Sequence, residues 1–128
     1  MTSNDISVAN FGPMRVEVRY NRTGAGEGPT VRVFGEYGEF LRADLFERGL
    51  QGPHYHINPY TNPKAGETAT RVDGITTPPA LLEHLLEVET LKALAQLAGE
   101  PKVAKYLTPA NDAEVKRFIS SMVNYVSK

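Results

Sequence analysis

The order of patterns along the chain predicts an α+β fold. Alternating apolar and polar residues, typical of half-buried strands, fill the first part of the chain, whereas helical spacing and helix-capping residues begin at Thr77. Strands followed by helices indicate a largely antiparallel sheet with one face packed on helices. We therefore predict one domain over residues 1–128, with a sheet part over about 11–73 and a helical part over about 78–127.

Four or five strands are predicted within residues 14–73. Residues 14–20 alternate strictly, and residues 30–34 alternate again after a glycine-rich connection, which predicts a hairpin. A third strand is predicted over 39–46 and a short fourth strand over 53–57. Residues 68–73 are the candidate for a fifth strand.

The helical part begins with a long segment over 78–98. Thr77 is its predicted N-cap, and Gly99 follows its end. Its apolar residues do not form one stripe, so the helix either breaks near 88–90 or is buried on two sides.

Two further helices are predicted after Gly99. Residues 102–107 have room for one or two turns. The final helix is expected to start at Asn111, with Glu114 completing a capping box, and its apolar residues recur at helical spacing as far as Val126.

Composition excludes several classes of protein. No apolar run is long enough for a membrane span, and the absence of cysteine excludes disulfides, a thiolate nucleophile and a cysteine-type zinc site. The 14 basic and 15 acidic residues give a net charge of −1, and the arginines of the first half are interleaved with glutamates, so nucleic acid is not an expected partner. The first residues lack the features of a signal peptide, which predicts a cytoplasmic protein.

The densest group of reactive side chains comprises Arg42, Asp44, His54 and His56. A His-x-His pair on a strand places both imidazoles on one face about 7 Å apart. Such a pair can act as an acid and a base, or as two ligands of one metal ion. A metal would need a third ligand, for which Asp44, His84 and Glu67 are the candidates. Because two histidines without a recognised spacing motif are weak support, the expectation is that no cofactor is bound, with a divalent metal at His54 and His56 as the less favoured alternative.

Strand register decides whether the histidines have a carboxylate partner. If residue 44 pairs with 54 or 56, Asp44 lies beside an imidazole and can orient it. If 46 pairs with 53, Asp44 lies opposite Tyr55, and Arg42 and Asp44 are only an ion pair on the sheet surface. Both alternatives remain open.

Residues 41–46 and 53–56 resemble small uncharacterised bacterial proteins in which an Arg-x-Asp strand precedes a Pro-His-x-His strand. The resemblance implies a domain of unknown function and brings no activity with it. His54-Tyr55-His56-Ile57 is also similar to part of the histidine-triad motif of nucleotide hydrolases and transferases. Asn58 stands where that motif has its third histidine, and the chain continues to residue 128 where that family ends soon after its motif.

Two classes of function are predicted. The first is a non-enzymatic association or binding domain, expected to form a homodimer through the helical part, because residues 80–98 carry apolar side chains on more sides than one sheet contact would bury. The alternative is an enzyme acting on phosphate esters such as nucleotides or RNA. In it, His54 and His56 with Asp44 would exchange protons and Arg42 would stabilise negative charge.

Overall fold

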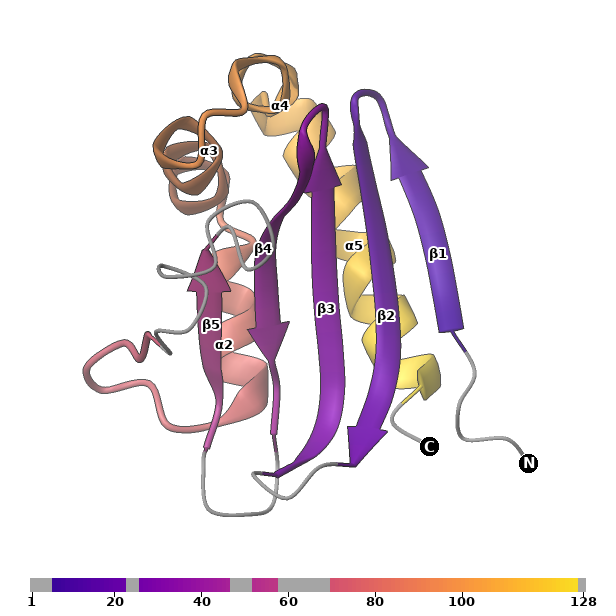
Figure 1. Ribbon diagram of the computed structural model, residues 1–128, viewed down its shortest axis with the longest axis vertical. Coiled ribbons are helices and arrows are strands. Elements are labelled where there is room, and N and C mark those ends of the chain that lie inside the picture. The colour runs from indigo at the N-terminus through magenta and orange to yellow at the C-terminus, as the bar shows by residue number, and fades with distance from the viewer. Residues whose placement is uncertain (1–5, 23–25, 47–51, 58–69, 127–128) are drawn as a thin grey trace.

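Five antiparallel strands form one sheet in which the spatial order follows the chain (Figure 1). The computed structural model describes residues 6–22, 26–46, 52–57 and 70–126. The strands are β1 (Ile6–Phe11), β2 (Met14–Arg22), β3 (Glu27–Gly35), β4 (Gly38–Asp44) and β5 (His54–Ile57). This sheet, followed by helices, confirms the predicted α+β class.

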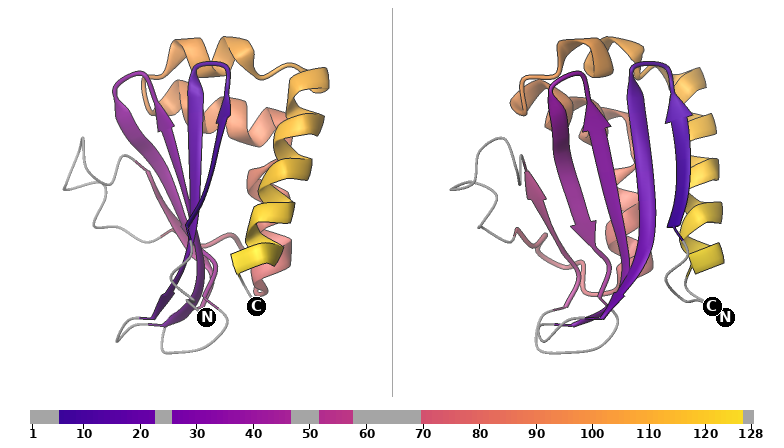
Figure 2. Two further views of the ribbon diagram at one scale, coloured as in Figure 1. Left: turned by 90° about the vertical axis from the view of Figure 1, so that its right-hand side faces the viewer. Right: turned by 45° about the vertical axis from the view of Figure 1, so that its right-hand side comes forward.

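All the described helices lie on one face of the sheet (Figure 2). They are α2 (Pro78–Leu85), α3 (Val88–Leu97), α4 (Pro101–Tyr106) and α5 (Pro109–Val126). The longest of them, α5, packs along β1, β2 and β3, while α3 and α4 cross the end of the sheet near the β1–β2 and β3–β4 turns. The opposite face of the sheet is covered by none of these helices.

The strands present alternate residues to the helices. In β2, Met14, Val16 and Val18 are buried, whereas Arg15 and Arg19, at alternate positions, are exposed. Equivalent inward residues of β3 and β4 and the apolar faces of the helices complete one core, which includes Val31, Val33, Leu41, Ala43, Leu81, Leu85, Leu91, Val115 and Ile119. Burying each larger apolar side chain stabilises the fold by roughly 1.5–3 kcal/mol. The sheet therefore has an apolar inner face and a polar outer face.

The strands differ from the prediction at both ends of the sheet. β1 was not predicted, because its apolar residues Ile6 and Val8 point to the exposed outer face and the segment lacks the usual alternation. The fifth strand predicted over 68–73 is wrong for residues 70–73, where only Thr70 pairs, in an isolated bridge to Tyr55. Residues 68 and 69 lie outside the described residues.

The long predicted helix breaks at Leu86 and Glu87, slightly before the predicted position. Because α2 and α3 point in different directions, each buries its own leucines. Most of the apolar residues that predicted a helical dimer interface are covered within the chain, namely Leu81, Leu82, Leu85, Leu86, Leu91, Leu94 and Ala95, whereas Leu97 is 73% exposed. The break between α2 and α3 thus explains why the apolar residues of 78–98 do not form one stripe, and no dimer contact is needed to explain it.

The start of α5 also differs from the prediction. The helix begins at Pro109, and the hydroxyl of Thr108 accepts a hydrogen bond from the backbone N–H of Asn111 at 3.4 Å. The side chain of Asn111 donates instead to the carbonyl oxygen of Tyr106 at 2.7 Å. Asn111 is therefore inside the helix, and the capping box predicted between Asn111 and Glu114 is wrong.

A buried carboxylate ties the helices to the sheet. Glu100, between α3 and α4, is 2% exposed. Its carboxylate oxygens accept hydrogen bonds from the backbone N–H groups of Glu36 at 2.8 Å and Tyr37 at 3.0 Å, in the β3–β4 turn. A side chain at Gly35 would collide with this carboxylate, which explains the glycine there.

We predict that Glu100→Ala lowers the free energy of unfolding by about 1–3 kcal/mol, because two turn N–H groups lose their acceptor. Urea denaturation followed by circular dichroism measures the loss. The matched control is Glu83→Ala on α2, where the side chain is exposed and the change should stay within about 0.5 kcal/mol. Equal losses in the two variants would contradict this role of Glu100.

Candidate functional site

The reactive residues predicted from sequence lie together on the outer face of the sheet. β4 pairs with β5 so that Asp44 is opposite His54 and Arg42 is opposite His56. Leu41 and Ala43 alternate with them and belong to the core, so these four side chains point away from the helices. Of the registers left open by the sequence, the structure has the one that pairs Asp44 with His54, and Tyr55 lies opposite Ala43.

One carboxylate oxygen is shared by both histidines. The Nε2 atom of His54 lies 3.1 Å from Oδ2 of Asp44, and Nε2 of His56 lies 3.2 Å from the same oxygen. The two imidazole rings are nearly perpendicular, with centroids 5.0 Å apart. All three residues are buried, at 5% exposure for Asp44, 2% for His54 and 7% for His56.

The second oxygen of Asp44 has its own neighbours. The hydroxyl of Thr30, on β3, donates to Oδ1 at 3.3 Å. Nε of Arg42 lies 3.4 Å from Oδ1, and the guanidinium also donates to Oδ2 at 3.5 Å. The carboxylate thus joins side chains from three adjacent strands.

His54 is held at both ring nitrogens. Its Nδ1 atom lies 2.8 Å from the backbone carbonyl oxygen of Gly52. Because a carbonyl oxygen only accepts, Nδ1 must carry a proton in this geometry. In the neutral ring, Nε2 then turns a lone pair toward the carboxylate of Asp44, and two acceptors this close need a proton or a cation between them.

The pKa of Asp44 is shifted by opposing effects. Burial raises the pKa of this carboxyl, but hydrogen bonds from His54 and His56 and the positive charge of Arg42 outweigh burial and hold the pKa well below its usual range. Asp44 is therefore a carboxylate throughout the physiological pH range, and the cluster has a fixed negative charge at its centre.

The cluster has the ligand set of a small metal centre. One ligand atom from each of Asp44, His54 and His56 lies within 4.8 Å of the other two. His84 does not belong to this group, since it lies on α2, on the helical side of the sheet. Glu67, the other candidate third ligand, and Asn58, the departure from the histidine-triad motif, lie outside the described residues.

Sequence reasoning missed two partners of the cluster. Thr30 lies two residues before Arg32 on β3, so both side chains point to the outer face of the sheet. Pairing β3 with β4 places Thr30 opposite Asp44, and the alternation along β3 could therefore have predicted this partner. The carbonyl of Gly52 carries no side-chain signal, and only the backbone path before β5 reveals it.

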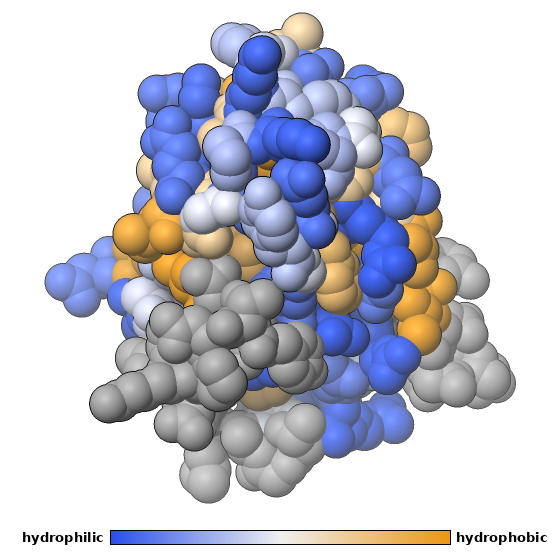
Figure 3. Space-filling view, turned by 45° about the horizontal axis from the view of Figure 1, so that its top comes forward, coloured by the Kyte–Doolittle hydropathy of each residue, from blue (hydrophilic) through white to orange (hydrophobic). Residues whose placement is uncertain are grey.

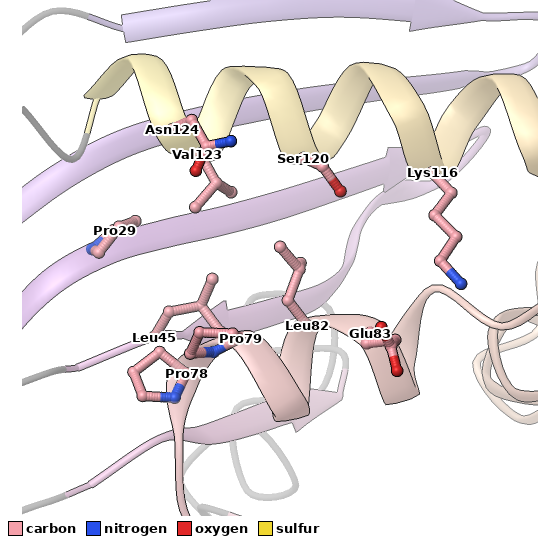
Figure 4. Close-up of a pocket in the computed structure, with 10 residues that line it drawn as sticks. All are labelled: Pro29, Leu45, Pro78, Pro79, Leu82, Glu83, Lys116, Ser120, Val123 and Asn124. Atoms are coloured by element: carbon pink, nitrogen blue, oxygen red, sulfur yellow. The ribbon is translucent and has the colours of Figure 1, made fainter.

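A separate cavity of about 360 Å³ lies on the other side of the sheet, between α2 and α5 (Figure 4). Pro29 and Leu45 line it from the sheet, next in sequence to Thr30 and Asp44, but none of the cluster residues reaches it. The candidate site is therefore the outer-face cluster.

The fold and the cluster together define a small α+β protein with a buried carboxylate–histidine centre on the sheet face away from the described helices. The chain belongs to the family described as domain of unknown function DUF7700, which matches residues 8–121. No curated protein and no solved structure matches the chain. Among the described residues, no helix has the length and apolar character needed to cross a membrane.

We predict that Asp44→Asn lowers the free energy of unfolding at pH 7 by about 3–5 kcal/mol, because Arg42 and the two buried histidines lose the carboxylate that pairs with them. The difference in the free energy of unfolding between wild type and Asp44→Asn should become smaller as the pH falls below about 4. In the unfolded chain the aspartate takes up its proton near pH 3.9, whereas in the folded protein its lowered pKa keeps it ionised, so its contribution is present above that pH and declines below it.

Urea denaturation from pH 7 to pH 2 measures both effects. Asp73→Asn is the control, because Asp73 is exposed. A difference between wild type and Asp44→Asn that stays constant from pH 5 to pH 2 would contradict the lowered pKa.

Proposed function

We propose that this domain binds one divalent transition-metal ion through Nε2 of His54, Nε2 of His56 and the carboxylate of Asp44. The observation that carries the proposal is the convergence of both imidazoles on one carboxylate oxygen, at 3.1 and 3.2 Å, while a carbonyl holds the far nitrogen of His54. One cation would bind all three of these ligand atoms at once.

The spacing of these atoms supports a shared ion. Two ligand atoms about 2.1 Å from a metal, at about 90–110° to each other, are separated by roughly 3.0–3.4 Å. Both nitrogen–oxygen distances, 3.1 and 3.2 Å, fall in this interval. The cluster therefore needs little rearrangement to take up an ion.

The hydrogen bond from His54 to Gly52 supports the same function. Metal-ligating histidines usually donate their second ring N–H to a carbonyl or carboxylate, which fixes the tautomer and points the free lone pair at the metal. Two imidazoles and one carboxylate suit zinc, iron, nickel or copper, whereas magnesium and calcium prefer oxygen ligands alone. Three protein ligands also leave a coordination position for water or another ligand.

Arg42 affects which extra ligand such an ion would take. Its guanidinium lies against the same carboxylate, so the charges of Arg42 and Asp44 cancel and the two positive charges of the ion are left uncompensated. An anion such as hydroxide, phosphate or a carboxylate is favoured at the open position. Phosphate esters, which the sequence analysis gave as substrates of the alternative function, carry such an anionic group and could bind the ion at this position.

Metal-free acid–base catalysis by both histidines is supported less well by this geometry. His54 faces a carbonyl at one nitrogen and a carboxylate at the other, so it offers no nitrogen to a substrate without losing one of these contacts. Catalysis of any kind, a cytoplasmic location and a bacterial source stay predictions from the sequence.

The test is calorimetric titration of the EDTA-treated full chain with Zn²⁺, Co²⁺ and Mg²⁺. We expect one equivalent of Zn²⁺ per chain, a visible absorption spectrum for bound Co²⁺, and no binding of Mg²⁺. His56→Gln should weaken Zn²⁺ binding at least about tenfold, because one of three ligands is lost.

The matched control is His84→Gln, which removes the histidine outside the cluster and should leave Zn²⁺ binding unchanged. Circular dichroism verifies that both variants are folded. Wild-type protein that ignores Zn²⁺ and Co²⁺, or equal losses in the two variants, would overturn the proposal.

A further inference from the structure

The outer edge of β1 is open for strand pairing. β1 is an end strand and pairs only with β2 within the described part of the chain. The backbone N–H and C=O groups along its other edge therefore lack strand partners there, and such an edge is a template for a further strand.

Exposed apolar side chains gather at this edge. The large hydrophobic residues exposed within the described ranges are Ile6, Val8, Tyr37, Leu97 and Phe118. Ile6 and Val8, 44% and 52% exposed, stand on β1 itself, and Phe118 on α5 packs against Phe11 of β1 with ring centroids 6.0 Å apart. Hydrophobic surface follows the right-hand margin of the molecule in Figure 3, the side on which Figure 1 places β1.

β1 lacks the features that usually protect an edge strand. Natural edges are commonly guarded by lysine, proline, bulges or very short strands. The six residues Ile6–Phe11 contain no charge and no proline, and they pair with β2 in an unbroken register. The edge is therefore long, regular and uncharged.

We propose that β1 pairs antiparallel with β1 of a second copy of this chain, with the two-fold axis at Val8, joining two five-stranded sheets into one. An uncharged strand meets an identical strand without repulsion between like charges, whereas a charged partner strand would find no counter-charge in β1. Two-fold antiparallel pairing uses the same surface on both copies, as most homodimers do. Because α5 packs along β1, the two α5 helices with Phe118 would lie on the same side of the joined sheet.

This interface replaces the one predicted from the sequence. Apart from Leu97, the leucines of residues 80–98 are buried within the chain, whereas α5 presents the exposed Phe118 beside β1. The dimer does not depend on the metal site, which lies at the opposite end of the sheet on β4 and β5.

Light scattering after size exclusion, with EDTA in the buffer to prevent metal bridging, gives the mass of the full chain. We expect twice the chain mass of 14.1 kDa for the wild type. Val8→Lys should weaken dimerisation at least about tenfold, because two lysines would face each other across the axis. Leu97→Lys, at an exposed apolar residue on α3 away from the edge, should leave the dimer intact.

Covalent trapping tests the geometry of the pairing. The natural chain has no cysteine, so Val8→Cys introduces one thiol on the outer face of β1. Paired strands bring facing Cβ atoms close enough for a disulfide, and mild oxidation at low protein concentration should give a cross-linked dimer, whereas Leu97→Cys should not. A monomeric wild type at high concentration, or equal behaviour of the residue 8 and residue 97 variants, would overturn the proposal.

Discussion

The carboxylate of Asp44 is the interaction on which the outer face of the sheet depends. It lies at the end of β4 and binds side chains of β3, β4 and β5. β5 has only four residues, and on its far side the described chain adds one bridge, at Thr70. A buried charge is tolerated only when it is paired, so the histidines and Arg42 stabilise the carboxylate, and the carboxylate in turn holds β5 on the sheet.

The two faces of the sheet have separate roles. The inner face supplies the apolar core, while the outer face carries ion pairs such as that of Arg32 with Glu39, together with the Asp44 cluster. Because the cluster is built from strand residues backed by the core, its side chains start from well-defined positions. Metal binding by such a cluster adds its free energy to folding, since the unfolded chain does not bring the ligands together.

Sequence patterns predicted most of this fold but not the geometry of the site. Alternation identified β2, β3 and β4 because each has one apolar face, and it failed for β1, where Ile6 and Val8 point outward. The sequence left the register of β5 open among pairings of residue 44 with 54, 55 or 56. The observed register wins because Tyr55 and Ile57 pack on the core, whereas a shift by one residue would bury both histidines among apolar side chains. That both imidazoles reach one oxygen follows from side-chain conformations, which the sequence does not reveal.

The most direct test of the shared carboxylate is an NMR measurement of the imidazole nitrogens during titration with zinc. Our account predicts that one equivalent of zinc shifts the Nε2 resonances of His54 and His56 together, in one saturable step, and leaves His84 unchanged. Nε2 resonances of His54 and His56 that respond to zinc independently, or that stay unchanged when zinc is in excess, would contradict it.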